Sequence, residues 1–201
     1  MKKPALRQHY QEVVVGKFLA KMKQKNVHCV PKLEKIVINS AIRAESDKSW
    51  IEEVIREIGL IAGQRPVIVR SKKSISNFKL RAGVPNGAKV TLRGTAMYEF
   101  LRRLVDIALP MIRDFRGLSA KFDGSGNYTL GIEDHSIFPE SSMDREKRSI
   151  GMDISFVTST SSDQDCKELL GMLGMPFQKR TQAAKLAAAK EDVVELIGQK
   201  E

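Results

Sequence analysis

Several short segments of this sequence alternate apolar and polar residues with a period of two, which is the spacing of a β-strand with one buried face. In the clearest segment, Lys89, Thr91 and Arg93 fall on one face and Val90 and Leu92 on the other. A sheet built from such strands must cover its apolar face with other elements, and it can leave its polar face exposed. This pattern therefore favours a layered fold with one open sheet face.

The same alternation occurs in three more segments. Their polar members are Lys35 and Asn39 in 33–40, Lys79 and Arg81 in 78–81, and Asp153 and Ser155 in 151–157. We expect each segment to be a strand whose apolar side packs against helices. Phe78 is ambiguous, because its ring could pack in the core or stack on a base.

Apolar residues at helical spacing predict four helices, over 5–22, from a cap at Ser46 to Gly63, from about Thr95 to Pro110, and from Ser162 to Gly174. Strands are expected at 33–40, 66–70, 87–93, 128–133 and 151–157, with another between 71 and 86, and 113–127 is expected to be a long exposed loop. Strands and helices are mixed without regular βαβ alternation. This favours an α+β fold, an open antiparallel sheet with helices packed on one face.

The chain of 201 residues suits a single domain, which we place at residues 1–180. From residue 181 the composition changes to Ala, Lys and Glu, so 181–201 is expected to be a C-terminal extension, helical or partly disordered. Its apolar residues could form one binding face for a neighbouring protein or RNA, or the segment could be a solvated appendage.

The charge of the chain is concentrated in one window. The 41 residues from Ile58 to Tyr98 contain no Asp or Glu, and the formal net charge of the whole chain is +10. The window holds eight basic residues: Arg65, Arg70, Lys72, Lys73, Lys79, Arg81, Lys89 and Arg93. Because like charges repel, a one-sign cluster indicates an anionic partner such as nucleic acid. The alternative is a solvated sheet edge whose charges deter aggregation.

The sequence offers little to support catalysis, and we expect no enzyme, cofactor or metal site. Its three His residues are scattered, and phosphate-loop and dinucleotide motifs are absent. The run Glu133-Asp134-His135 could be imagined as an acid–base site, but adjacent strand residues point to opposite faces. A nucleic-acid-processing enzyme would place metal-binding carboxylates near the basic window, and that window has none.

Membrane binding and secretion are also disfavoured. Peripheral membrane binding would require a basic amphipathic helix, whereas the basic residues here fall mainly on expected strands and loops. The N-terminus lacks the apolar core of a secretory signal, and the cysteines Cys29 and Cys166 have no paired spacing. We expect a cytoplasmic protein.

A family resemblance covers roughly residues 5–178. The chain resembles the bacterial L-five family of large-ribosomal-subunit proteins in six successive segments: VPKLEKIVINS (30–40), AGQRPVIVRSKKSISNFKLRAGVPNGAKVTLRG (62–94), MYEFLRRLVDIALPMIRDFRGL (97–118), FDGSGNYTLGI (122–132), IFPE (137–140) and GMDISFVT (151–158).

The resemblance implies a structural protein of the large subunit that binds 5S rRNA in the central protuberance, beside neighbouring rRNA and ribosomal proteins. Carried over by position, the 5S rRNA contacts are Asn39, Gln64, Phe78, Thr91 and Arg93, and strand alternation adds Lys89 to them. The loop from about Ser71 to Gly87 resembles a segment that reaches P-site tRNA, with Lys72, Lys73, Lys79 and Arg81 as its phosphate contacts.

The resemblance also implies an intersubunit bridge to small-subunit protein thirteen, formed by Arg113, Asp114, Phe115 and Arg116. The chain departs from the family pattern in two places. First, a glycine-containing turn usually follows Asn39, whereas here Ser40-Ala-Ile-Arg-Ala44 follows. Second, bacterial members typically stop near Pro176-Phe177, whereas this chain continues to Glu201.

Overall fold

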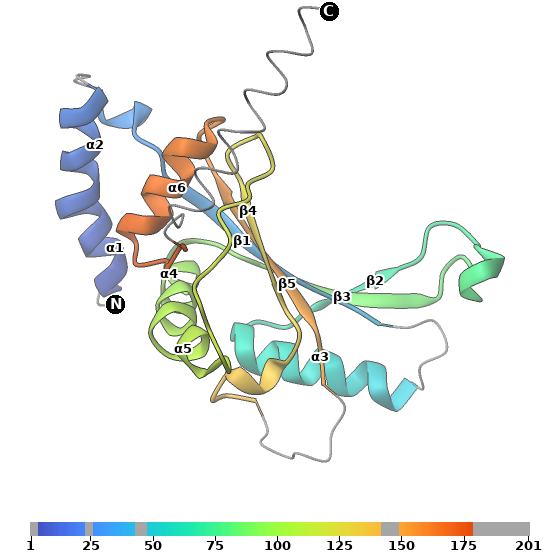
Figure 1. The fold of residues 1–201 in the computed structure, drawn as a ribbon. Coiled ribbons are helices and arrows are strands. Elements are labelled where there is room, and N and C mark those ends of the chain that lie inside the picture. The colour runs from blue at the N-terminus through green and yellow to red at the C-terminus, as the bar shows by residue number, and fades with distance from the viewer. Residues whose placement is uncertain (1–3, 23–25, 43–47, 142–148, 179–201) are drawn as a thin grey trace, which may run out of the picture.

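The computed structural model describes residues 4–22, 26–42, 48–141 and 149–178 (Figure 1). These residues form a five-stranded antiparallel sheet with the strand order β2-β3-β1-β5-β4. The strands are β1 (Leu33–Ala41), β2 (Val67–Arg70), β3 (Pro85–Leu92), β4 (Tyr128–Ile132) and β5 (Met152–Thr158). The sheet is open, as the sequence predicts, and β2 and β4 are its edges.

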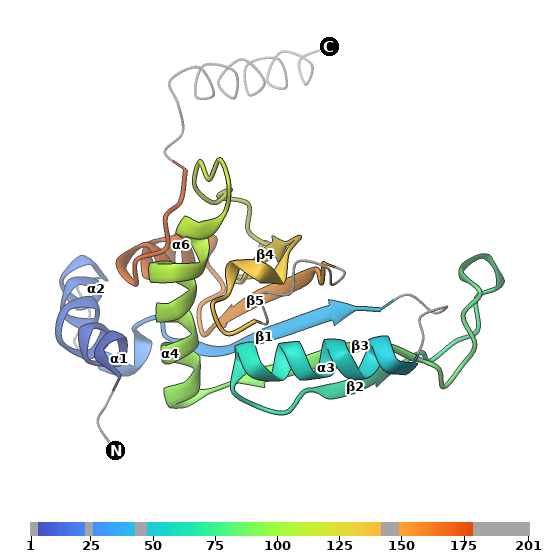
Figure 2. The same cartoon turned by 90° about the horizontal axis from the view of Figure 1, so that it is seen from below.

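Helices pack on one face of this sheet (Figures 1 and 2). They are α3 (Lys48–Ala62) and a long helix composed of α4 (Gly94–Arg103), the π-helical segment η4 (Leu104–Ala108) and α5 (Leu109–Met111). The apolar sides of the strands supply the other half of the core, through residues such as Ile36, Ile38, Val90, Leu92, Ile154 and Phe156. Burial of these side chains is the main force that holds the layers together.

A second group of helices lies at one end of the sheet, where α1 (Ala5–His9), η1 (Tyr10–Val14) and α2 (Val15–Met22) run on as one helix beside α6 (Asp163–Met172). His9 and Met172 are joined by a hydrogen bond of 3.2 Å, and Lys21 pairs with Glu168. At the opposite end, β2 and β3 project beyond the helices as a long hairpin (Figure 1). None of the described helices is long and apolar enough to span a membrane.

Most predicted elements are confirmed, including the Ser162 cap, whose Oγ accepts a hydrogen bond from the Asp165 amide. The expected strand between 71 and 86 is wrong. That stretch contains a 3₁₀ turn, η3 (Ser76–Phe78), and Lys79 has the left-handed φ of 49°. Thr95 is not a cap either, because the helix already begins at Gly94. The Ser46 cap and the extension 181–201 lie outside the described residues.

The unusual segment after Asn39 is strand rather than turn. Ser40 pairs with Ala88 and Ala41 with Gly87, so β1 continues past the expected position of a glycine turn. Ser40 is buried, and its hydroxyl donates a hydrogen bond of 2.7 Å to the Gly151 carbonyl on the other side of β1. The backbone path here is therefore set by pairing with β3 on one side and by the hydrogen bond from Ser40 to Gly151 on the other.

Candidate nucleic-acid interface

The polar faces of the central strands combine into one surface, which we call the open face. Cross-strand pairs place Lys89, Asn39, Asp153 and Gly131 in one row, because Asn39 pairs with Lys89 on β3 and with Asp153 on β5. Lys89, Asp153 and Gly131 are exposed, so the described residues leave this side of the sheet open. The row therefore presents a cation, an amide and a carboxylate to the outside.

A second row lies one pleat along the strands and contains Thr91, Val37, Ser155 and Thr129. Thr129 and Ser155 share a hydrogen bond of 3.1 Å between their hydroxyls. Among the described residues, the side chains of Asn39, Lys89 and Thr91 make neither a hydrogen bond nor an ion pair. These side chains are free to contact phosphates, 2′-hydroxyls or base edges.

Two further candidates, Arg93 and Gln64, lie outside the two rows of the open face. Arg93 is exposed and directly precedes α4, with an extended φ of −139°. Gln64 is exposed in the connection between α3 and β2, beside a shallow groove floored by Ile55, Leu60 and Pro66. The pairing of the strands thus brings Asn39, Lys89 and Thr91 together, whereas Gln64 lies off the sheet.

The hairpin loop, residues 71–84, carries the other basic candidates. Lys72, Lys73, Lys79 and Arg81 are all exposed, and so is Phe78, at 73%. This exposure excludes core packing for Phe78 and corrects the expected alternation over 78–81, in which Phe78 and Leu80 would share a buried side. The loop is held by backbone hydrogen bonds between Ile75 and Leu80 and by the Ser74 hydroxyl, which accepts from the Ala82 amide at 3.0 Å.

The segment 113–118 is hydrogen-bonded to residues 176–178, at the end of the described part of the chain. The Leu118 amide donates to the Pro176 carbonyl at 2.8 Å, and the Gln178 amide donates to the Leu118 carbonyl at 2.9 Å. Arg113, Asp114 and Arg116 are exposed, but Phe115 packs partly against the core. Three of the four bridge candidates are therefore accessible, and Phe115 supports the segment from beneath.

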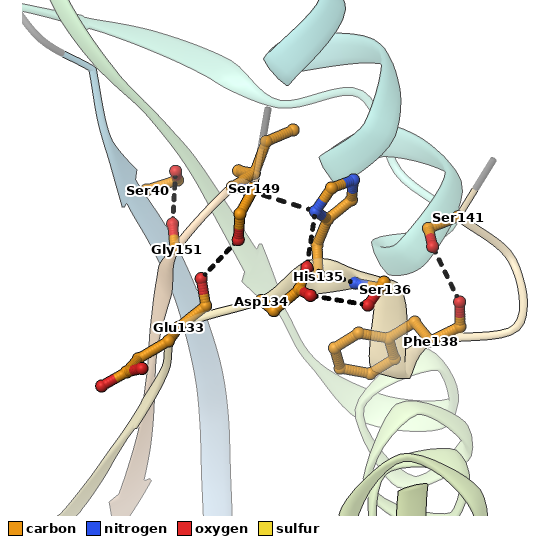
Figure 3. A network of polar contacts seen from close by, with 10 residues as sticks. Ser40, Glu133, Asp134, His135, Ser136, Phe138, Ser141, Ser149 and Gly151 are labelled. Atoms are coloured by element: carbon orange, nitrogen blue, oxygen red, sulfur yellow. Dashed lines mark hydrogen bonds and ion pairs between the residues drawn. The ribbon is translucent and has the colours of Figure 1, made fainter. Parts of the chain in front are cut away.

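The run Glu133-Asp134-His135, which follows β4, takes part in a network of hydrogen bonds (Figure 3). His135 is buried, and its Nδ1 accepts a hydrogen bond of 3.2 Å from the Ile150 amide. Burial opposes ionisation of Asp134, but hydrogen bonds from the Ser136 amide and hydroxyl outweigh it and lower the pKa of Asp134. The run lies just beyond β4 and not within a strand, which corrects the expected placement of its residues. No group of possible metal ligands occurs among the described residues.

Asp153, Ser155 and Thr129 also lie in the two rows of the open face but were not among the residues predicted to contact RNA. Their alternation with buried neighbours is visible in the sequence, so an outward orientation could be inferred. Their place beside Asn39 depends on the pairing of β5 with β1, which joins residues more than a hundred positions apart.

The sequence matches known ribosomal protein families over most of its length. Residues 26–81 match the family model described as "Ribosomal protein L5", and residues 85–177 match the model that describes the C-terminus of the same ribosomal family. The chain is similar to proteins named "Large ribosomal subunit protein uL5" from Oceanobacillus iheyensis (51% identity), Halothermothrix orenii (48%) and Alkaliphilus oremlandii (49%). Each alignment spans 176 residues, 87% of this chain and 98% of the relative. The chain therefore belongs to the ribosomal L5 family.

Proposed function

We propose that this chain binds 5S rRNA through the open face and acts as a non-enzymatic component of the cytoplasmic ribosome. Membership of the family makes the chain a structural constituent of the large ribosomal subunit. The RNA that it binds and the residues that bind it are the proposal. Neighbouring rRNA and ribosomal proteins complete its surroundings.

The observation that carries this proposal is a set of polar side chains on the open face, Lys89, Asn39 and Thr91, which make no hydrogen bond and no ion pair among the described residues. Lys89, Asn39 and Thr91 lie on adjacent strands, so one RNA backbone can contact all three. Lys89 supplies a cation for phosphate, while Asn39 and Thr91 supply neutral donors and acceptors. Arg93 and Gln64 extend the contact at its margins, and Phe78 lies farther out on the hairpin loop.

The hairpin loop supports a second contact, with P-site tRNA. Its basic side chains lie at the far end of a hairpin that projects beyond the helices, where it can reach a partner other than the RNA on the open face (Figure 1). Exposed Lys72, Lys73, Lys79 and Arg81 suit phosphates, and the exposed ring of Phe78 suits a base or ribose.

The segment Arg113–Arg116 supports the third contact, a bridge to small-subunit protein thirteen. Arg113 and Arg116 are exposed, and Asp114 has the left-handed φ of 52°, which makes a sharp turn between them. Hydrogen bonds to residues 176–178 fix the base of the segment, so its charged groups are held at the surface.

The experiment that tests the RNA contact is a salt-dependent binding measurement with 5S rRNA and an unrelated RNA of equal length. We expect tighter binding to 5S rRNA at physiological salt. Lys89→Gln should reduce the slope of log K against log salt by about 0.7–0.9, because one phosphate contact is lost. Asn39→Ala and Thr91→Ala should reduce the preference for 5S rRNA more than the slope.

Lys167→Gln is the matched control, since it removes one exposed positive charge from α6, away from the open face. It should leave the preference for 5S rRNA unchanged and alter the slope less than Lys89→Gln does. Equal affinity of the unmodified protein for both RNAs, or wild-type behaviour of all three open-face variants, would refute the assignment.

A further inference from the structure

Asp153 is an acidic residue in the middle of the proposed RNA interface. It lies on β5 between Asn39 of β1 and Gly131 of β4. Its side chain is exposed, and within the described residues its carboxylate makes no hydrogen bond and no ion pair. A free carboxylate on a surface that binds a polyanion requires a specific explanation.

The neighbourhood of Asp153 leaves room for a ligand group. Gly131, its partner on β4, has no side chain, and a Cβ placed there would lie 3.6 Å from Asp153 Oδ1. Lys89 lies two strands away in the same row, a separation of roughly 10 Å at the usual spacing of strands. A phosphate held by Lys89 is therefore far enough from Asp153 for a different part of the RNA to reach the carboxylate.

The chemistry of a carboxylate limits which group of the RNA can contact Asp153. An ionised carboxylate only accepts hydrogen bonds and repels phosphate, so among the phosphate, ribose and base groups of the RNA its partner must be a neutral donor. The wide minor groove of an RNA helix presents two such donors, the ribose 2′-hydroxyl and the exocyclic amine of guanine. A DNA helix, or a phosphate-only contact, offers Asp153 no 2′-hydroxyl.

We propose that Asp153 is a specificity-determining residue that accepts a hydrogen bond from a minor-groove donor of the bound RNA, a 2′-hydroxyl or a guanine amine. This inference rests on the proposed function, because it requires RNA on the open face. Asp153 lowers affinity for polyanions in general and raises the relative affinity for an RNA that presents a donor at this point.

Asp153→Asn tests the inference, because it keeps the size of the side chain and removes its charge. Binding is measured with three probes: 5S rRNA, 2′-fluoro 5S rRNA and 5S rRNA with inosine in place of guanosine. The fluorine keeps the A-form sugar but cannot donate, and inosine lacks the amine. For the unmodified protein, we expect one modified probe to bind about tenfold more weakly, the effect of losing one hydrogen bond to a charged group.

For Asp153→Asn, the difference in affinity between that modified probe and unmodified 5S rRNA should shrink to about threefold or less. The affinity of this variant for an unrelated RNA should rise. If Asp153→Asn reduces the loss of affinity caused by the 2′-fluoro substitution, the donor is the 2′-hydroxyl. If it reduces the loss caused by inosine, the donor is the guanine amine. Glu34→Gln is the matched control, since Glu34 lines a cavity with Arg7 and Tyr10 away from the open face. It should discriminate among the probes as the unmodified protein does.

Equal discrimination among the probes by the unmodified protein and Asp153→Asn would overturn the role of Asp153. If Lys89→Gln still lowers the salt slope in that case, the proposed function stands and only this inference fails. If Asp153→Asn and the three variants Lys89→Gln, Asn39→Ala and Thr91→Ala all bind 5S rRNA as the unmodified protein does, the open face is not the interface and both proposals fail.

Discussion

Gly87 on β3 lies so close to Ser40 on β1 that a Cβ atom at position 87 would be 2.7 Å from the Ser40 carbonyl oxygen. Both residues are buried, and both occupy the stretch where β1 extends beyond Asn39. A methyl group at this distance from a backbone atom cannot be relieved by rotating a side chain. The close approach therefore requires glycine at position 87.

Gly87→Ala should destabilise the fold by about 1–3 kcal/mol, because the two strands must separate to admit the methyl group. Urea unfolding followed by circular dichroism measures the change. Gly171→Ala in α6 is the contrasting variant, since nothing lies within 4 Å of its added Cβ. It should be neutral or stabilising by up to about 1 kcal/mol. Equal effects of the two variants would contradict the steric argument.

Phe78→Ala should weaken RNA binding without weakening the fold. The ring is 73% exposed, so its removal should change the free energy of unfolding by less than about 0.5 kcal/mol. Loss of one stacked base should cost about 1–3 kcal/mol in binding free energy, measured with tRNA and with 5S rRNA separately. Phe78→Tyr retains the ring and should bind like the unmodified protein. Unaltered binding of Phe78→Ala to both RNAs would leave the ring without the proposed role.

Arg103 joins α4 to two other parts of the fold, and its loss should destabilise the protein. One nitrogen pairs with the Glu140 carboxylate, and another donates to the Ile61 carbonyl at 3.2 Å. Arg103→Met keeps the aliphatic stem but leaves both acceptors unpaired, which should cost about 1–3 kcal/mol at this partly exposed site. Arg102→Met breaks an exposed pair with Asp106 and should cost at most about 1 kcal/mol by the same urea assay. A smaller loss for Arg103→Met than for Arg102→Met would reject this ranking.

The two cysteines should differ in reactivity. Cys29 is exposed, whereas burial raises the pKa of the Cys166 thiol to about 11. At pH 8, iodoacetamide should alkylate Cys29 in the folded protein and reach Cys166 only after denaturation, as detected by mass spectrometry.

The raised pKa also predicts a dependence of stability on pH. The fold favours the neutral thiol, so this contribution is present below pH 9.0, the ordinary pKa, and is lost as the pH rises toward 11. The difference in unfolding free energy between the unmodified protein and Cys166→Ala should therefore be smaller at pH 10.5 than at pH 8. An unchanged difference would count against the pKa shift.

Local patterns in the sequence predicted the outward faces of the strands, because alternation depends only on neighbouring residues. The outward orientation of Lys89 and Thr91 was predicted correctly for this reason. The adjacency of Asp153 to Asn39 could not be predicted, since it depends on which distant strands pair. The alternation expected over 78–81 was wrong because serine side chains hold this loop: the Ser71 hydroxyl donates to the Lys73 carbonyl at 2.7 Å, and the Ser74 hydroxyl accepts from the Ala82 amide. Such local hydrogen bonds compete with strand formation.

Strand β3 belongs both to the centre of the sheet and to the hairpin, and these two regions differ in how well they tolerate insertions and deletions. Deleting one residue within Pro85–Leu92 would shift the register by one position, turning Lys89 and Thr91 toward the core and Val90 toward solvent. Residues added at the tip of the hairpin, near Asn77, would lengthen an exposed loop and leave every cross-strand pair of the sheet in place. Over evolutionary time, the reach of the hairpin can therefore vary by insertion and deletion, while the spacing of the open face can change only by substitution.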